Sequence, residues 1–261
     1  TKNAPLRIDK KKFHGQNSRQ TIFNSCNTIL SNIEEGLYEY NTDGLIFTPT
    51  NLGVGCNSST DVPKPYKTSW KYSLKWKPSE FNTIDFLITT KKTSTGSEFI
   101  GNLFEAGLDT KKIEQVIQYK TIILRVGFDE RKHGYINPCQ NIIDDKLPSV
   151  DNIETDATYK PVQFFPTNPY DPDAGITNLV VKIDKNNKKQ MLSEENDIIE
   201  DNMIVEFKYD FNKDKQWRWI PLRVRYDKTA EYRSGHKNYG NAYHVAQSNW
   251  NSIHNPITVE M

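Results

Sequence analysis

The sequence predicts a strand-rich α+β protein of 261 residues, and three observations lead to this prediction. Aromatic residues make up 11% of the chain while alanine is scarce, and aromatic side chains favour β-strands. Short apolar, β-branched runs bounded by Gly, Pro and Asn recur along the chain, as expected of strands joined by turns. Helical spacing of apolar residues is found in two segments, which predicts a minority of helix.

The N-terminal third is predicted to hold one helix and several strands. The helix is indicated by apolar residues at helical spacing that end near Gly36, namely Ile22, Cys26, Ile29, Leu30, Ile33 and Leu37. Strands are expected at residues 6–8, 44–48, 72–77 and 83–88. The stretch 51–65 is rich in Gly, Ser, Asn and Pro and is predicted to be a loop.

The remainder is predicted to consist of short strands, one small helix and long loops, as in a small, partly open barrel. The strands are expected at residues 121–128, 178–183, 203–209 and 219–226, and the helix at 109–119. Residues 160–175 contain four prolines and are expected to be an extended loop. Residues 91–97 are interpreted as a hinge or exposed turn near a domain boundary, and the polar residues after 229 as a linker.

The bulk composition excludes some functions. Lys and Arg (34) nearly balance Asp and Glu (33), so any affinity for phosphate has to come from local clusters. The three cysteines are far apart and fit neither a disulfide framework nor a zinc site, which favours a reducing compartment. No apolar run is long enough to cross a bilayer, so no membrane partner is expected.

Two lysines, Lys75 and Lys77, are the most informative feature of the chain. Side chains alternate along a strand, so both lysines point the same way, while Leu74 and Trp76 are expected to point into a core. Two ammonium groups side by side on a buried strand repel each other unless an anion lies between them. Lysine suits phosphate oxygens, so the pattern predicts a nucleotide phosphate site.

Several motifs of the chain resemble a known family. Asp-Gly-Leu-Ile-Phe at residues 43–47, Leu-Lys-Trp-Lys-Pro at 74–78 and Asn-Thr-Ile-Asp-Phe at 82–86 resemble motifs IV and V of the eukaryotic and viral mRNA capping guanylyltransferases. The segment 219–228, which ends in Arg-Tyr-Asp-Lys, resembles motif VI of that family. Residues 249–257 resemble the connector to a methyltransferase domain in the fused capping enzymes of large DNA viruses.

The resemblance implies a domain organisation. Residues 1–90 would be the C-terminal part of a ligase-type (ATP-grasp-like) nucleotidyltransferase domain, residues 91–230 an OB-fold lid domain, and residues 231–261 a linker towards a methyltransferase domain. The Lys-x-Asp-Gly motif with the family's nucleophilic lysine is absent from the chain, as is the Asp-Gly-Glu of motif III. We therefore expect a fragment of a multifunctional enzyme fused to triphosphatase and methyltransferase domains; an inactive paralogue is the alternative.

The resemblance also implies an activity. The family transfers GMP from GTP, through a lysyl–GMP intermediate, to the 5′-diphosphate end of RNA in mRNA capping. Lys75 and Lys77 would contact the α-phosphate, and Asp43 would be a ligand for Mg²⁺ or Mn²⁺ in the pocket that Gly44 also lines. A viral enzyme of this kind would act in a cytoplasmic viral factory or in the virion.

Motif VI would act from the second domain. Arg225, Asp227 and Lys228 would serve catalysis there, with Arg225 and Lys228 binding the β- and γ-phosphates as the lid closes. If residues 219–226 are a strand, alternation places Arg223, Arg225 and Asp227 on one face. The hinge of the lid is expected at residues 91–97.

Simpler interpretations remain open for each motif. Lys75 and Lys77 are also compatible with an ordinary solvated strand, and Asp43-Gly44 with a turn that enters a strand. The Arg223/Arg225 pair would suit a surface face that pairs with nearby acids. The competing functions are a fragment of an ATP-dependent polynucleotide ligase and a non-catalytic module that docks RNA or a protein partner.

Overall fold

The computed structural model describes residues 12–15, 20–62, 70–104, 116–134, 136, 138–143, 145 and 159–259. The chain divides into two compact units, one up to Lys77 and one from Pro78 onward, and each is described by itself. The strand predicted at residues 6–8 lies outside the described residues. Both units mix helices with antiparallel strands, which confirms the predicted strand-rich α+β class. The assignment of nucleotidyltransferase and OB-fold domains stays a prediction.

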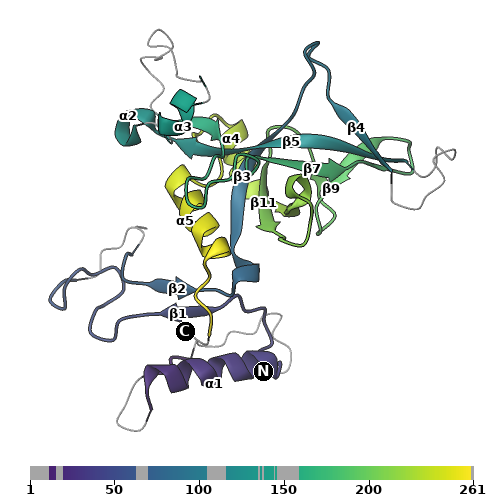
Figure 1. Ribbon diagram of the computed structural model, residues 1–261. Coiled ribbons are helices and arrows are strands. Elements are labelled where there is room, and N and C mark those ends of the chain that lie inside the picture. Colours follow the sequence, from purple (N-terminus) through teal and green to yellow (C-terminus); the bar gives the residue numbers. More distant parts are fainter. Residues whose placement is uncertain are drawn as a thin grey trace. The chain divides into compact units, whose positions relative to one another are not determined.

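The first unit contains one helix, α1 (Ile22–Glu34), and the strands β1 (Leu45–Phe47) and β2 (Leu74–Trp76), as Figure 1 shows. The helix begins where the Thr21 side chain accepts a hydrogen bond from the Asn24 N–H at 3.2 Å. It ends before Gly36, whose φ of +67° lies in the left-handed region that terminates helices. The predicted helix is therefore confirmed, including its glycine stop.

Strands β1 and β2 form an antiparallel pair in which Leu45 lies opposite Trp76 and Ile46 lies opposite Lys75. Leu45 is buried and Trp76 half-buried, but Leu74 is 64% exposed and Ile46 50% exposed. The prediction that Leu74 points into a core is therefore wrong. The reason is that, among the described residues of this unit, only Ser25, Leu45 and Cys56 are buried, so a two-stranded sheet has no second layer to cover it.

The second unit is built on a sheet that, within the described residues, has seven antiparallel strands. They are β3 (Thr83–Thr90), β4 (Ile100–Phe104), β5 (Val116–Phe128), β6 (Lys160–Gln163), β7 (Ile176–Val180), β11 (Ile204–Tyr209) and β12 (Trp219–Val224). The long strand β5 pairs with β3 and β4 and also with β6 and β7 (Figure 1). Its β-branched sequence suits this central place.

Shorter elements complete the second unit. Strands β8 (Lys182–Ile183), β9 (Lys189–Leu192) and β10 (Ile198–Ile199) form a small antiparallel sheet. The helices are α2 (Glu130–His133), α3 (Pro138–Ile143), α4 (Tyr226–Arg233) and α5 (Tyr243–His254), with the 3₁₀ turns η1 (Ser79–Phe81) and η4 (Lys215–Trp217). No helix in the described part of the chain has the length and apolarity that a membrane crossing requires.

Most predicted strands are confirmed, and the exceptions have physical reasons. Residues 116–119, predicted as the end of a helix, belong to β5, and the rest of that predicted helix lies outside the described residues. The predicted extended segment 160–175 begins with strand β6. The predicted strand 219–226 ends at Val224, because helix α4 begins at Tyr226.

The turn at residues 91–97 is exposed, as predicted, but it does not lie between the two units. The Thr93 N–H donates to the Ser97 carbonyl at 2.8 Å, and the flanking strands β3 and β4 both pair with β5. Because both flanks belong to one sheet, the hinge predicted here is wrong. The division between units falls instead after Lys77.

Helix α5 occupies the segment that was predicted to be a polar linker. Ala246, Trp250 and Ile253 lie on one face of the helix and are buried in the core. The Trp250 indole packs against Tyr209 and Trp219, with ring centroids 5.0 and 5.9 Å away, and its Nε1–H donates to the Pro169 carbonyl at 2.9 Å. This segment is therefore part of the folded second unit.

Truncation of the Trp250 ring tests this conclusion. We expect Trp250→Ala to lower the free energy of unfolding by about 3–5 kcal/mol, because a fully buried indole leaves a cavity. The matched control is Val245→Ala on the exposed side of α5, for which the loss should stay below about 1 kcal/mol. Urea denaturation followed by tryptophan fluorescence and circular dichroism measures both. Equal stability of Trp250→Ala and the parent would contradict the placement of α5.

Candidate functional site

The predicted site residues fall into two groups, one in each unit. Asp43, Gly44, Lys75 and Lys77 belong to the first unit, at the start of β1 and on or just after β2. The motif VI residues, from Arg225 to Lys228, belong to the second unit. Each group is described within its own unit.

In the first unit, the predicted cation and the predicted metal ligand contact each other directly. Lys77 Nζ lies 2.5 Å from Asp43 Oδ2, and the Asp43 side chain is 70% exposed. The hydrogen bond from Lys77 is the main cause that lowers the pKa of Asp43; slight burial opposes it, and the charges of Lys77 and Lys75 add to it. The Asp43 carboxylate is thus held ionised beside the two lysines. Its negative charge offsets the repulsion between their ammonium groups.

Gly44 explains how Asp43 reaches Lys77. Its φ of +137° lies outside the conformations of L-residues, so the alternation of β1 stops at this position. A Cβ atom on Gly44 would lie 2.1 Å from the carbonyl oxygen of Trp76. The glycine therefore serves two purposes: it turns the chain, and it lets β1 approach β2 closely.

Lys75 lies on β2 and is exposed to solvent, opposite Ile46 of β1. The prediction of a buried lysine pair is therefore wrong for Lys75, while Lys77 is half-buried. The proximity of Lys75 to Asp43 is still evident, because its charge contributes to the lowered pKa of that carboxyl. The three side chains form one local charge cluster on the first unit.

A pair of glycine substitutions tests the role of Gly44. Gly44→Ala should disrupt the pairing of β1 with β2, because the added methyl meets backbone atoms that cannot move aside. Gly55→Ala is the matched control: its φ is +86°, but no atom lies within 4 Å of the added Cβ. We expect the control to cost about 1–2 kcal/mol from backbone strain alone and Gly44→Ala distinctly more.

Hydrogen exchange of the backbone amides of residues 45–47 and 74–76 measures this effect. Faster exchange in Gly44→Ala but not in Gly55→Ala is the expected result. Identical exchange in both variants would contradict the close approach at Gly44.

In the second unit, Arg225, Asp227 and Lys228 lie at the start of helix α4. Arg225 is the residue that precedes the first helical turn, and Asp227 lies in that turn. The predicted strand alternation of these residues is therefore wrong. Helical geometry instead brings positions three apart to the same side, so Arg225 and Lys228 reach a common partner.

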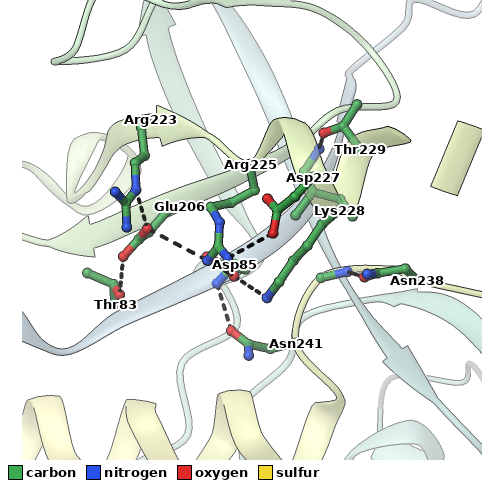
Figure 2. A network of polar contacts seen from close by, with 12 residues as sticks. Thr83, Asp85, Glu206, Arg223, Arg225, Asp227, Lys228, Thr229, Asn238 and Asn241 are labelled. Carbon is green, nitrogen blue, oxygen red and sulfur yellow. Dashed lines mark hydrogen bonds and ion pairs between the residues drawn. The ribbon is translucent and has the colours of Figure 1, made fainter. Parts of the chain in front are cut away.

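That partner is Asp85, a residue of β3 that is only 5% exposed. Its Oδ2 atom accepts from Arg225 Nη1 at 2.8 Å and from Lys228 Nζ at 2.6 Å, as Figure 2 shows. Asp227 lies on the outer side of Arg225, with its Oδ2 3.4 Å from Arg225 Nη2. Two motif VI cations therefore share one buried carboxylate.

A second carboxylate, that of Glu206, lies beside this contact. Glu206 of β11 is directly opposite Asp85 of β3 in the strand register, and like charges in that position destabilise a sheet. Strand β12 flanks β11 on its other side, and there Arg223 lies opposite Glu206 and donates to its Oε2 at 2.8 Å. Arg225 lies 4.0 Å from the same oxygen. Three cations thus compensate the carboxylates on this face of the sheet (Figure 2).

The ionisation of Glu206 reflects this compensation. Burial raises the pKa of Glu206, but hydrogen bonds from Thr83 and Arg223 and the positive charges of Arg223 and Arg225 outweigh it, so the pKa is lowered overall. Thr83 Oγ1 donates to Glu206 Oε1 at 2.7 Å. The carboxylate is therefore anionic at neutral pH and stays a partner for the arginines.

Backbone contacts fix the position of the network. The Asn241 side chain accepts from the Asp85 N–H at 2.7 Å, and the Asn241 N–H donates to the Asp85 carbonyl at 2.8 Å. On the helix side, the Thr229 hydroxyl accepts from the Ile204 N–H at 2.9 Å, which holds α4 against β11. Both sides of the ion pair are thus anchored to the sheet.

Three residues of this network, Asp85, Glu206 and Asn241, are not among the predicted site residues. For Asp85 the sequence did hold a signal, because a carboxylate stands inside the otherwise apolar run from Ile84 to Ile88. A buried charge requires a partner. For Glu206 and Asn241 the contacts depend on strand register and loop path, which the sequence does not state.

Substitution of Asp85 tests the network. Asp85→Ala should lower the free energy of unfolding by about 2–4 kcal/mol, because it leaves two cations without their shared partner. The loss is smaller than for a fully enclosed ion pair, because Arg225 and Lys228 keep about a quarter of their side chains exposed. The control is Arg223→Ala, whose side chain is about half exposed and should contribute at most about 1 kcal/mol. Chemical denaturation measures both, and a smaller loss for Asp85→Ala than for Arg223→Ala would refute this view of the network.

The described residues also bear on metal binding. No group of three or more His, Cys, Asp or Glu side chains that could hold a metal ion is found among them. Asp43 offers one exposed carboxylate, which fits the habit of Mg²⁺ to take one or two protein carboxylates and complete its shell with phosphate and water. It is therefore suited to be one ligand of such an ion, not a metal site by itself.

The fold and the predicted residues define a strand-rich α+β protein with two ionic clusters. The chain is 30% identical over 232 residues to a protein of Acanthamoeba polyphaga mimivirus described as a probable mRNA-capping enzyme. The match covers 86% of this chain, which spans about 16% of that relative. The predicted relationship to a viral capping enzyme is therefore confirmed. No family model matches the chain.

Proposed function

We propose that this chain is part of an mRNA guanylyltransferase, which transfers GMP from GTP through a lysyl–GMP intermediate to the 5′-diphosphate end of RNA. The observation that carries the proposal is the similarity over most of the chain to a probable mRNA-capping enzyme. The contact between Asp43 and Lys77 supports it, because these residues come from the motifs assigned to the nucleotide site.

The lysine pair is the proposed site for the α-phosphate of GTP. Phosphoryl-type transfers are catalysed mainly by positioning and by neutralising charge on the phosphoryl oxygens. Lys77 is held in place by Asp43, while Lys75 is exposed and able to meet an incoming anion. A negatively charged phosphate would add to the anionic compensation that Asp43 supplies.

Asp43 is also the proposed ligand of Mg²⁺ or Mn²⁺. When bound, the ion would neutralise charge on the phosphates of GTP. The chain's own contribution would be an ionised carboxylate at neutral pH, which the lowered pKa of Asp43 supports.

The motif VI residues Arg225, Asp227 and Lys228 are proposed to act on the β- and γ-phosphates. In the structure, Arg225 and Lys228 both bind Asp85, so the phosphates would share or replace that carboxylate. Arg225 stays ordered by its neighbours Asp227 and Glu206. The function of the second unit as an OB-fold lid remains part of the proposal.

The nucleophilic lysine is proposed to lie in another part of a larger polypeptide, because no Lys-x-Asp-Gly motif is present and the chain spans about 16% of its relative. Fusion to triphosphatase and methyltransferase domains, and a location in a viral factory or virion, belong to the same proposal. The described part of the first unit is consistent with it: β1 and β2 leave Ile46 and Leu74 exposed, as strands would whose covering layer belongs to another part of the polypeptide.

Guanylylation of the complete parent protein tests the proposal. With radiolabelled GTP and Mg²⁺ we expect a covalent, acid-labile protein–GMP adduct, and Lys75→Ala and Lys77→Ala should each reduce its formation at least about 100-fold. Lys71→Ala is the matched control, since Lys71 lies on the same unit over the Tyr72 ring and outside the motif. Thermal denaturation confirms that each variant is folded.

Three other outcomes would decide against the proposal. An adduct formed with ATP and not GTP would favour the polynucleotide ligase. The lack of any adduct in the parent protein, together with RNA binding, would favour a docking module. Normal adduct formation by both lysine variants would remove the phosphate site from this chain.

A further inference from the structure

An aromatic cavity in the second unit has no part in the proposed guanylylation site. It has a volume of about 410 Å³, within the usual range of ligand pockets, and lies beside β5, α2 and the start of α5. Half of the residues that line it carry aromatic or imidazole rings, namely Phe128, His133, Tyr159, Tyr243 and His244. Gly127, Asp129, Ile136, Ala242 and Gln247 complete the lining.

Two of these rings are already engaged in the fold and form the base of the cavity. Phe128 is buried and meets Tyr243 edge to face, with ring centroids 5.3 Å apart. The Tyr243 hydroxyl donates to the Phe165 carbonyl at 2.8 Å, and burial raises the pKa of Tyr243 to about 12. This base is therefore rigid and uncharged at neutral pH.

The Tyr159 ring is packed over strand β5, with its hydroxyl end against Gly127. Its ring lies so close to Gly127 that a Cβ atom there would meet the Tyr159 oxygen at 2.0 Å, so only glycine admits the ring. Tyr239 packs beside it, with ring centroids 5.5 Å apart. The packing against Gly127 and Tyr239 thus fixes the Tyr159 ring as one wall of the cavity.

Two histidines of the cavity lining are exposed to solvent. His133 and His244 are both exposed, and their ring centroids lie 6.1 Å apart. His133 also packs against Phe128 at 6.1 Å, so its imidazole is positioned although its outer face is open. Across the described part of the chain, the side chain of His244 makes no hydrogen bond, so its ring is free to stack with a ligand.

The cavity adjoins the ionic network through one short segment. Asn241 binds the backbone of Asp85 on one side, and its carbonyl accepts from the Gly127 N–H at 3.0 Å. The next residue, Ala242, lines the cavity. A ligand in the cavity would therefore lie close to the strand positions that carry Asp85 and the motif VI cations.

We propose that this cavity binds an unpaired base of single-stranded RNA by stacking on its rings. Single-stranded RNA is recognised mainly through bases that stack on Phe, Tyr, Trp or His side chains, which is the composition of this wall. The inference rests on the proposed function, because that function makes RNA the acceptor substrate. It adds a place for the RNA outside the GTP motifs.

Fluorescence anisotropy with a labelled 12-nucleotide single-stranded RNA that carries a 5′-diphosphate tests the proposal on the full chain. Tyr159→Ala and His244→Ala should each weaken binding about 5- to 150-fold, the range found for loss of one stacked base. His236→Ala is the matched control, because its exposed imidazole contacts Ser234 outside the cavity. His244→Phe should restore binding, since phenyl keeps the stacking surface.

The salt dependence separates stacking from charge effects. The slope of log affinity against log salt should be the same for the wild type and Tyr159→Ala, whereas loss of one phosphate contact lowers it by about 0.7. A 2-aminopurine base in the RNA should be quenched by the wild type and less by Tyr159→Ala. Since His244 is exposed, its substitution reports on binding even if Tyr159→Ala fails to fold.

Two results would overturn the proposal: RNA affinity unchanged in both His244→Ala and Tyr159→Ala, or equal affinity for fully paired RNA, whose bases cannot enter the cavity. Tight binding of free GMP to the cavity, with no preference for RNA, would also overturn it in favour of a mononucleotide site. The RNA-binding assay contains no GTP and does not depend on guanylylation. A failure of guanylylation would therefore refute the proposed function without affecting the measured RNA affinities.

Discussion

The second unit depends on one buried carboxylate. Asp85 stands inside the apolar strand β3, and a charge in that position is costly unless it is paired. Arg225 and Lys228 supply the pairing from the start of α4, and Asn241 supplies hydrogen bonds to the backbone of the same residue. Since these partners come from the helix and from the loop before α5, one residue fixes two C-terminal segments against the sheet: its carboxylate binds α4, and its backbone binds the loop.

The same requirement organises the neighbouring strands. The register places Glu206 beside Asp85, and the positive charges of Arg223 and Arg225 reduce the repulsion between the two carboxylates. Below this polar face, Phe86, Phe207 and Trp219 turn to the opposite side of the sheet and form the aromatic core that α5 covers. The alternation of β3 thus separates an ionic face from an aromatic core within a single strand.

Motif residues that match a catalytic pattern also have structural roles here. Gly44 permits the close approach of β1 to β2, and Asp43 compensates Lys77. Arg225 and Lys228 neutralise Asp85. Under the proposed function, GTP would meet cations that are already positioned and partly neutralised. The protein would then exchange one anionic partner for another, and no bare cluster of positive charge would have to be maintained.

The sequence by itself determined the strand-rich class, helix α1 with its glycine stop, and most strands of the sheet, because apolar periodicity and turn residues act locally. It also determined the relationship to a viral capping enzyme, through motifs in a fixed order. Helix α5 was missed although its inward residues, Tyr243, Ala246, Trp250 and Ile253, recur at helical spacing, because polar residues predominate in the segment that contains them. Only the tertiary structure decided that Arg225 and Lys228 meet at Asp85, because pairing across more than a hundred residues is not a local property. It also decided that Leu74 and Lys75 are exposed, because the sequence of a strand does not state whether another layer covers it.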